Sequence, residues 1–359
     1  MWPDQRVMQM LGIDLPIIQA PMAGAGLSDL AVAVAEAGGL GSLPCALLTP
    51  DQLRNQLGIF RQKTTRPINI NFFCHEAPAP DAEREAAWQR RLAPYYRELG
   101  LDPEAPAPTS NRAPFDDAFC DMVEELRPEV VSFHFGLPER ALLDRVAATG
   151  ARILSSATTV DEARWLEDRG CHAIIAQGYE AGGHRGMFRT DTVATQIGTL
   201  SLVPQVVDAV RVPVIAAGGI ADGRGIAAAF MMGASAVQIG TAYLFTPEAT
   251  IAEPHRRALA ASSDRETALT NVFTGRPARG IVNRIMREVG PIAPEAPQFP
   301  LAGGALAPLR SASEPEGSED FMSLWSGQSA GLSRAMPAGN LTRNLADQAL
   351  ELLVRGPSR

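Results

Sequence analysis

The sequence predicts an α/β fold, a (β/α)8 barrel, on three observations. Eight short apolar runs recur between residues 16 and 239, they are rich in Val, Ile and Ala, and segments of helical period separate most of them. Eight parallel strands are the number that closes a barrel of this class. The expected strands are Pro16–Ala20, Gly39–Leu43, Pro67–Asn71, Val130–Phe133, Ala151–Ser155, Ala173–Gln177, Pro213–Ala217 and Ala236–Ile239.

Helices are expected between these strands, several of them beginning after a capping Ser, Thr or Asp. Thr159 followed by Glu162 has the spacing of a capping box, in which each residue satisfies a backbone N–H of the other's turn. The expected helices are Ser28–Ala37, Pro50–Lys63, Phe115–Leu126, Glu139–Thr149, Val160–Arg169 and Gly223–Met232.

Two stretches are longer than the minimal repeat requires. Residues 75–128, Pro-rich at 77–80 and 103–108, predict an insertion after the third strand that leads into the helix near 115–126. Residues 251–359 predict a mostly helical cap packed on the mouth of a barrel formed by residues 1–250. The cap would contain helical pieces at Ile251–Ser262, Asp320–Leu324 and Leu341–Leu353 and a Pro/Gly-rich segment at Gly290–Pro308.

Composition excludes several classes of function. A net charge of -8 over 359 residues leaves no excess of cations to bind nucleic acid phosphates. Four cysteines without a C-x-x-C pair suggest no zinc or iron–sulfur site. No signal peptide and no apolar run of about 18 residues is found, so we expect a cytoplasmic protein without a membrane span, as a monomer or homodimer.

Two glycine-containing loops follow the seventh and eighth strands. Gly218 and Gly219 close the first of these strands, and Gly240 and Thr241 close the second. Glycine lets backbone N–H groups approach an anion without a Cβ in the way, and this position binds phosphate in many barrels. Tight turns alone would explain any single glycine, but the pair of loops favours a phosphate site.

Other strand ends carry apolar or amide groups. Ala20, Pro21 and Met22 after the first strand are suited to lie along a flat aromatic ring. Asn69 and Asn71 bring amides to the third strand, where an unpaired polar group is costly to bury and so favours a ligand partner. We expect the two to face different ways; a hydrogen-bonded core Asn is the alternative.

Two histidines are candidates for chemistry. His184 lies in Gly182-Gly-His-Arg-Gly, where the glycines leave few side chains to bury it, and an ordinary pKa near 6.5 suits a proton acceptor. His134 ends the fourth strand, with a site role and a core hydrogen bond equally open. Walker, G-x-G-x-x-G and G-x-S-x-G motifs are absent, which leaves nucleotide-phosphate, Rossmann and serine hydrolase sites unsupported.

Together, Gln19-Ala-Pro-Met-Ala-Gly, Asn69, Ala176-Gln-Gly-Tyr-Glu-Ala-Gly-Gly-His-Arg-Gly and Ala216-Ala-Gly-Gly-Ile-Ala-Asp-Gly-Arg-Gly resemble the nitronate monooxygenase family over nearly the whole chain. Ser132-Phe-His-Phe-Gly and Leu324-Trp-Ser-Gly-Gln-Ser-Ala-Gly point to its class I. The resemblance implies a TIM barrel that holds FMN, with His184 as the catalytic histidine; His134 is the second catalytic candidate. The implied cofactor-binding residues are Ala20, Pro21, Met22, Asn69, Gln177, Gly182, Gly218, Gly219, Gln238, Gly240, Thr241, Ser326 and Gln328, the last two from the cap.

The implied reaction oxidises alkyl nitronates with O2 to a carbonyl compound and nitrite, through one-electron transfer and a flavin semiquinone. His184 would deprotonate neutral nitroalkanes. Class I members place tyrosines and a lysine after the barrel, near the substrate. Here no Tyr follows Tyr243 and no Lys follows Lys63. This departure puts a preference for small anionic nitronates in question. Phe299 is the candidate to replace one of those rings.

Two other functions stay open at this stage. An NAD(P)H-dependent flavin reductase of quinones or enoyl thioesters would share the barrel and the glycine–histidine loop, and bleaching of the flavin by NADH or NADPH would reveal it. An FMN-binding sensor is the non-enzyme alternative, which turnover of any nitronate would remove.

Overall fold

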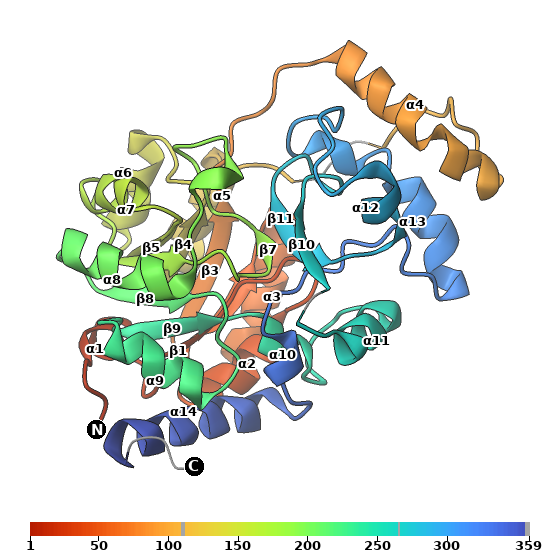
Figure 1. Cartoon of the computed structure of the whole chain (residues 1–359). Coiled ribbons are helices and arrows are strands. Elements are labelled where there is room, and N and C mark those ends of the chain that lie inside the picture. The colour runs from red at the N-terminus through yellow and green to blue at the C-terminus, as the bar shows by residue number, and fades with distance from the viewer. Residues whose placement is uncertain (109–111, 265, 356–359) are drawn as a thin grey trace.

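Parallel strands form a barrel wall in the computed structural model, which describes residues 1–108, 112–264 and 266–355 (Figure 1). The eight-stranded sheet found in these residues has the order β1-β9-β8-β6-β5-β4-β3-β2, and a bridge between Ile18 and Leu40 joins its two edges. The Gln19 side chain reinforces that seam, because its amide bonds both the N–H and the carbonyl of Ser42. The barrel is therefore closed, as predicted. Its strands are β1 (Ile17–Gln19), β2 (Gly41–Pro44), β3 (Ile68–Phe73), β4 (Val130–His134), β5 (Arg152–Ala157), β6 (Ala173–Gln177), β8 (Val214–Ala217) and β9 (Ala236–Ile239).

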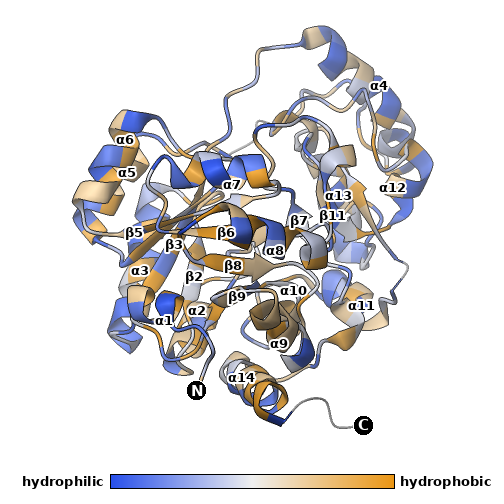
Figure 2. Cartoon of the chain, turned by 60° about the vertical axis from the view of Figure 1, so that its left-hand side comes forward, coloured by the Kyte–Doolittle hydropathy of each residue, from blue (hydrophilic) through white to orange (hydrophobic). Residues whose placement is uncertain are grey.

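Helices surround the barrel, and all six that the sequence predicted between the strands are present. They are α2 (Ser28–Glu36), α3 (Pro50–Lys63), α5 (Asp117–Leu126), α6 (Arg140–Ala148), α7 (Val160–Glu167) and α9 (Gly223–Met231); α8 (Thr199–Ala209) adds one between β6 and β8, and α1 (Arg6–Leu11) precedes β1. In Figure 2 the strands are largely hydrophobic and the helices show both hydrophilic and hydrophobic residues, as expected for helices that cover a core on one side.

The last helix, α14 (Ala338–Arg355), lies in the stretch expected to form the cap but packs against α9 and α2 (Figure 1). It thus fills the place of the eighth barrel helix, separated from β9 by residues 240–337. Leu341, Leu345 and Ala349 on one face of α14 are buried in the barrel core. The cap is therefore inserted within the final β/α unit of the barrel.

A small antiparallel sheet, which the sequence did not predict, joins the cap to the loop after β6. Its strands are β10 (Thr267–Thr270), β11 (Ala278–Ile281) and β7 (Gly183–His184), in the order β10-β11-β7. The expected helix at Asp320–Leu324 is wrong: this segment turns into a bridge between Trp325 and Gly280. Asn283 holds it there by donating to the carbonyls of Glu319 and Met322, which competes with helical hydrogen bonding.

The remaining elements after β9 are short. They are α10 (Thr241–Leu244), α11 (Glu253–Ala261), α12 (Arg284–Val289), α13 (Ala307–Ser313) and the 3-10 turns Leu301–Gly303, Glu314–Glu316 and Ala330–Leu332; Val193–Thr195 forms a further 3-10 turn after β7.

The insertion after β3 forms a long helix, α4 (Ala82–Glu98), that packs on the cap (Figure 1). Trp88, Leu92 and Tyr96 on one face enter a hydrophobic cluster shared with the cap. The Trp88 indole donates to the carbonyl of Ala302 at 3.1 Å and the Tyr96 hydroxyl to that of Ala305 at 2.7 Å. Residues 109–111 of the expected insertion and 356–359 of the expected cap lie outside the described residues.

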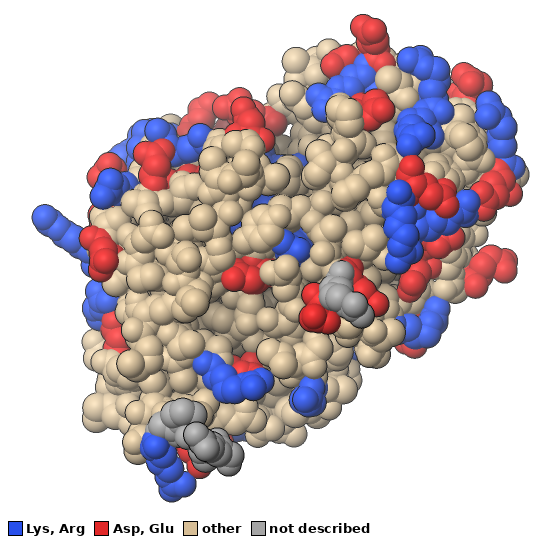
Figure 3. Space-filling view, in the orientation of Figure 1, with Lys and Arg blue, Asp and Glu red and all other residues tan. Residues whose placement is uncertain are grey.

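Charged side chains of both signs are interspersed over the α4 side of the molecule on the face shown in Figure 3. Among the described helices, none is long and apolar enough to cross a membrane. The described residues also contain no group of three or more His, Cys, Asp or Glu side chains able to hold a metal ion.

Candidate active site

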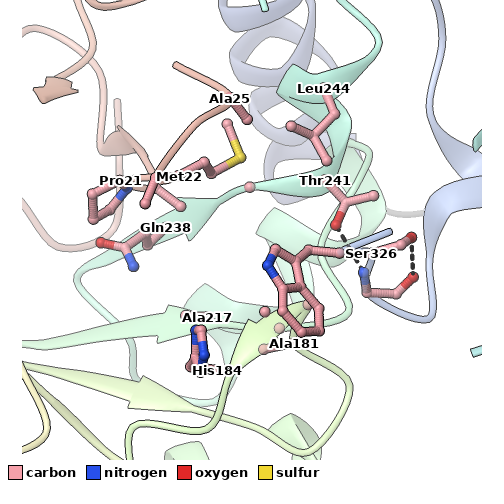
Figure 4. A pocket seen from close by; sticks show the side chains of 18 of the residues that line it. Pro21, Met22, Ala25, Ala181, His184, Ala217, Gln238, Thr241, Leu244 and Ser326 are labelled. Carbon is pink, nitrogen blue, oxygen red and sulfur yellow. Dashed lines mark hydrogen bonds between the residues drawn. The ribbon is translucent and has the colours of Figure 1, made fainter. Parts of the chain in front are cut away.

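A cavity of about 310 Å³ opens at the carboxyl ends of the barrel strands, under the cap (Figure 4). Loops after β1, β6, β8 and β9 supply one wall, and the cap segment 322–329 supplies the other. Most of the residues predicted from the sequence meet here: Ala20, Pro21, Met22, His134, Gln177, Gly182, His184, Gly218, Gly219, Gln238, Gly240, Thr241 and Ser326 line the cavity. Asn69 and Gln328 do not.

The glycine loops leave backbone donors on the cavity wall. Gly218 and Gly219 adopt positive φ angles of 108° and 74°, a region that L residues with side chains rarely enter. A Cβ on Gly240 would lie 3.4 Å from that of Ala20. Within the described residues no acceptor takes the N–H of Gly219 or of Gly240. Unpaired N–H groups on a cavity wall, with the Thr241 hydroxyl beside them, form a site suited to an anion.

The wall after β1 is apolar, and Figure 4 shows Pro21 and Met22 beside the Gln238 amide. Gln238 lines the cavity, and its Oε1 is buried without a hydrogen-bond partner in the described part of the chain. An orphaned buried acceptor costs free energy unless a ligand donates to it. This wall therefore offers a flat apolar surface with one acceptor to a bound group.

His184 sits where the barrel and the cap meet. Its backbone forms β7, which pairs with β11 of the cap. Its carbonyl accepts hydrogen bonds from Gln177 Nε2 at 2.9 Å and His134 Nε2 at 3.2 Å, both from the barrel. Its ring Nε2 lies 3.0 Å from Thr274 Oγ1 of the cap. Two barrel side chains and one cap side chain thus fix the backbone and the ring.

The His184 ring is enclosed by aromatic side chains. Its centroid lies 5.4 Å from those of Phe299 and Trp325 and 6.0 Å from those of Phe73 and Phe135. Burial is the largest cause that lowers the pKa of His184 well below its ordinary 6.5, and the positive charge of Arg112 is the next largest. The imidazole is therefore neutral at neutral pH and able to accept a proton.

His134 also lines the cavity, but both of its ring nitrogens are engaged. Because a carbonyl only accepts, the bond to the His184 carbonyl assigns the proton to Nε2. Nδ1 then accepts from the Ser156 hydroxyl at 3.1 Å. Burial lowers the pKa of His134 to about 4, so the ring stays neutral. With no free ring nitrogen, His134 is placed to support the His184 loop.

The two asparagines of β3 do not face different ways, and that expectation is wrong. Residues two apart in a strand project from the same face, so Asn69 and Asn71 both point into the barrel at different depths. Asn69 is fully buried against the Ser42 hydroxyl, whereas Asn71 is one layer nearer the mouth and lines the cavity. The Oδ1 of Asn69 finds no partner among the described residues.

Gln177 and Gln328 make contacts other than those expected from the sequence. Gln177 commits its amide to the His184 loop, because its Oε1 also accepts from the Gly186 N–H at 2.7 Å. Gln328 is exposed, and only its backbone N–H reaches the loop after β6, at the carbonyl of Glu180.

Several cavity residues were not predicted from the sequence. Trp325 comes from the cap, whose small sheet was not predicted, and Asn71 was passed over for Asn69. Thr274, also of the cap, bonds the His184 ring without lining the cavity and was not predicted either. Arg112 and Arg310 also line the cavity, which gives it cations although the chain has no lysine after Lys63. In a chain whose cations are almost all Arg, no local signal distinguishes these two.

Comparison with known proteins identifies the family. The family model described as nitronate monooxygenase matches residues 4–348. The chain is 41% identical to a nitronate monooxygenase of Pseudomonas aeruginosa, over 96% of this chain and 98% of that protein. It is 42% identical to one of Paraburkholderia phytofirmans, over 94% and 93% of the two chains.

The chain belongs to the nitronate monooxygenase family. The family resemblance found in the motifs is therefore confirmed, and the chain is an oxidoreductase of this family.

Solved structures agree with this assignment. The nitroalkane oxidase from Streptomyces ansochromogenes superposes with a TM-score of 0.88 at 40% identity, covering 96% of this chain and 98% of that one. FabK from Thermotoga maritima superposes with a TM-score of 0.73 at 28% identity, covering 98% and 97%. The barrel of this nitronate monooxygenase family member is thus shared with a second, more distant group of proteins.

Proposed function

We propose that this chain is an FMN-dependent enzyme that oxidises alkyl nitronates, and neutral nitroalkanes after deprotonation, with O2 to a carbonyl compound and nitrite. The observation that carries the proposal is the neutral His184 imidazole in the same cavity as the unpaired N–H groups of Gly219 and Gly240. A proton acceptor and an anion cradle in one enclosed cavity are the two parts that such a flavoenzyme requires.

The residues present fit FMN. The phosphate would be held by the N–H groups of Gly219 and Gly240 and by the Thr241 hydroxyl, which accepts from the Gly327 N–H at 2.9 Å and keeps its own proton to donate. The ring would lie against the apolar wall at Pro21, with the orphaned Oε1 of Gln238 as an acceptor. When bound, FMN supplies the electron transfer from substrate to O2.

His184 handles the proton when the substrate is a neutral nitroalkane. The Thr274 hydroxyl donates to the carbonyl of Arg276 at 3.4 Å, so it accepts from Nε2–H of His184 and leaves Nδ1 as the basic atom. Nδ1 removes the proton from the carbon that bears the nitro group, and the substrate becomes the nitronate anion. His134 and Gln177 act as positioning residues, because they hold the carbonyl of the same residue.

Absorbance and product assays test this function. Purified protein should show a flavin spectrum, release FMN on denaturation, and form nitrite from propyl nitronate in air. Anaerobic mixing with propyl nitronate should change the flavin spectrum. A protein without flavin, or a flavin that propyl nitronate leaves oxidised, would sink the proposal.

The second candidate is the flavin-dependent reductase left open by the sequence, which takes electrons from NADH or NADPH and would share the barrel and the glycine–histidine loop. Anaerobic addition of either nucleotide discriminates the two. Bleaching of the flavin within the time of one turnover supports the reductase, and an unchanged spectrum with NADH and NADPH removes it.

The oligomeric state and the cytoplasmic location remain predictions from the sequence.

A further inference from the structure

A second cavity, of about 590 Å³, lies beside the first on the rim between barrel and cap. The loops after β3 and β4 and the loop after β7 form its barrel side, and residues 275–277 and 298–299 form its cap side. Phe135 and Phe299 line this outer cavity and also contact the His184 ring of the inner one. One layer of aromatic rings therefore separates the two cavities.

The cation of the outer cavity is Arg276. Its guanidinium stacks on the Phe135 ring, 4.0 Å from the centroid, and Nη2 donates to the carbonyl of Met187. Nε is buried without a partner, and no hydrogen bond engages Nη1 within the described residues. The guanidinium is thus fixed in direction by stacking and by one bond, with donors left over.

Arg276 also lacks a carboxylate partner. Arg145 and Arg284 differ from it in this respect: Arg145 bonds three carboxylates, and Arg284 bonds Glu98 and Glu288. No carboxylate of the described residues lies within 4.0 Å of Arg276, although Glu162 and Asp191 are close enough to favour its charge. A half-buried cation without an ion pair is costly unless an anion visits it.

The other titratable side chains that line the outer cavity carry no positive charge. His75 is 6% exposed, and burial lowers its pKa to about 4, so it is neutral. Glu76 and Asp191 are exposed at the rim, where solvent screens them.

One strained backbone conformation lies at the same place. Phe135 has a φ of 70°, which is unusual for a bulky residue, and this conformation places its ring beneath the guanidinium. Strained residues persist where the surrounding structure holds them, and they cluster at ligand-binding sites.

We propose that the outer cavity binds a small organic monoanion with a planar oxyanion group, a carboxylate or a nitronate, on the Arg276 guanidinium. Arginine suits such groups because its donors form a planar fork. One consequence rests on the proposed function: the outer cavity holds anionic substrate close to His184, separated from it by one layer of aromatic rings.

Trp165 provides a probe, because it lines the outer cavity while Trp325 lines the inner one. Iodide, a monoanion, quenches tryptophan fluorescence on contact. The difference between wild type and Trp165→Phe holoenzyme isolates the Trp165 signal. We expect its quenching by iodide to saturate and to be reversed by propionate.

Arg276→Met and Arg276→Gln should raise the iodide concentration for half-saturation at least tenfold. Arg276→Gln keeps an amide donor for the Met187 carbonyl, so one variant should fold even if the other does not. Arg279→Met is the matched control, since Arg279 stacks on Tyr179 at 4.7 Å in the same cap sheet and does not line the outer cavity. Quenching by neutral acrylamide should be unchanged in all three.

Iodide quenching that does not saturate, that Arg276→Gln leaves unchanged, or that Arg279→Met weakens equally would overturn the anion site. The assay needs no turnover, so it stands apart from the proposed function. If nitronates are substrates, Arg276→Gln should also lower kcat/KM for propyl nitronate and leave kcat unchanged. If the quenching behaves as expected and no nitronate is oxidised, the anion site stands and the proposed function falls.

Discussion

The barrel wall and the cap wall of the inner cavity are built differently. On the barrel side, Gly240 directly follows β9 and Gly219 follows β8 after one intervening residue, so the ladders of these strands fix both. On the cap side, the segment that carries Ser326 is attached through single bonds, such as Gly327 N–H to Thr241 Oγ1 at 2.9 Å and Ser329 Oγ to the Gly219 carbonyl at 2.9 Å. In the proposed function, cofactor binding would therefore depend mainly on the barrel, and proton transfer on His184, which bonds both walls.

The largest effect is expected from a substitution in the barrel wall of the inner cavity. Gly219→Val should give largely apo protein, because the positive φ strains any side chain and its Cβ would occupy the wall of the anion cradle. The ratio of flavin to protein absorbance measures this. Gly150→Val is the matched control: Gly150 has a φ of 87° and no atom within 4 Å of its Cβ position, so it carries the strain away from the cavity. Full flavin content in Gly219→Val, or equal loss in both variants, would contradict the cradle.

The next largest effect is expected at His184, where the barrel and the cap meet. His184→Asn should lower turnover of neutral nitroalkanes by about 10²- to 10⁴-fold, the usual contribution of a general base, and leave preformed nitronates largely oxidised. Wild-type kcat/KM for a nitroalkane should rise as pH rises through the His184 pKa, since the neutral imidazole accepts the proton. Because that pKa is lowered, the rise should be complete below about pH 6.5.

Steady-state rates on nitroethane and ethyl nitronate at several pH values measure both effects. Equal loss on the two substrates would mean that His184 positions the substrate, and unchanged activity on both would remove it from the reaction.

The same difference between the walls explains what the sequence could predict. All eight barrel strands were located because each buried run is mostly apolar, and the strand ends then placed the glycine loops, the apolar wall and the two histidines at the cavity; Gln177 and Gln238 came from the family resemblance. Most of the barrel side of the site follows from this one pattern.

The cap side could not be predicted in this way. Strand β10 is Thr-Ala-Leu-Thr and β11 contains Arg279 and Gly280, so neither is a continuous apolar run of the kind that predicted the barrel strands. β7 is a two-residue strand that exists only because β11 lies beside it. Thr274 and Trp325 reach His184 through this tertiary arrangement, and no local pattern in the chain encodes it.

The insertion was a different case, since its signal was present. Trp88, Leu92 and Tyr96 recur every four residues on one face of α4, which is a helical period. The Pro-rich runs on either side and Pro94 within the helix favoured irregular structure instead. The cluster shared with the cap outweighs the cost of that proline.

Acid should destabilise both walls. Burial lowers the pKa of His75, His134 and His255 to about 4, whereas the unfolded chain titrates near 6.5. Below pH 6.5 the unfolded state therefore binds more protons, and stability falls as pH falls toward 4. At pH 5 each histidine should cost roughly 2 kcal/mol of the free energy of unfolding. Urea unfolding at pH 7 and pH 5 measures the loss.

His255 serves to separate the cap from the barrel in this experiment. Its Nε2 bonds the carbonyl of Trp325 at 3.1 Å, so His255→Gln keeps a donor there but cannot titrate. This variant should lose less stability than wild type between pH 7 and pH 5. An identical loss would show that His255 is not buried as a neutral ring.

The smallest expected effect decides which wall orients the His184 ring. Thr274→Val removes the cap-side acceptor of the His184 Nε2–H. A neutral hydrogen bond contributes about 0.5–1.5 kcal/mol, so its loss should lower kcat/KM for a neutral nitroalkane by roughly 3- to 10-fold. Preformed nitronates should be oxidised at the wild-type rate, and Thr274→Ser should restore the nitroalkane activity. Ser156→Ala removes a bond from the barrel side instead, but it acts on His134, one residue further from the ring. Its effect on nitroalkanes should therefore be smaller than that of Thr274→Val. If Ser156→Ala costs more, the barrel side alone holds the base, and the cap serves only to enclose it.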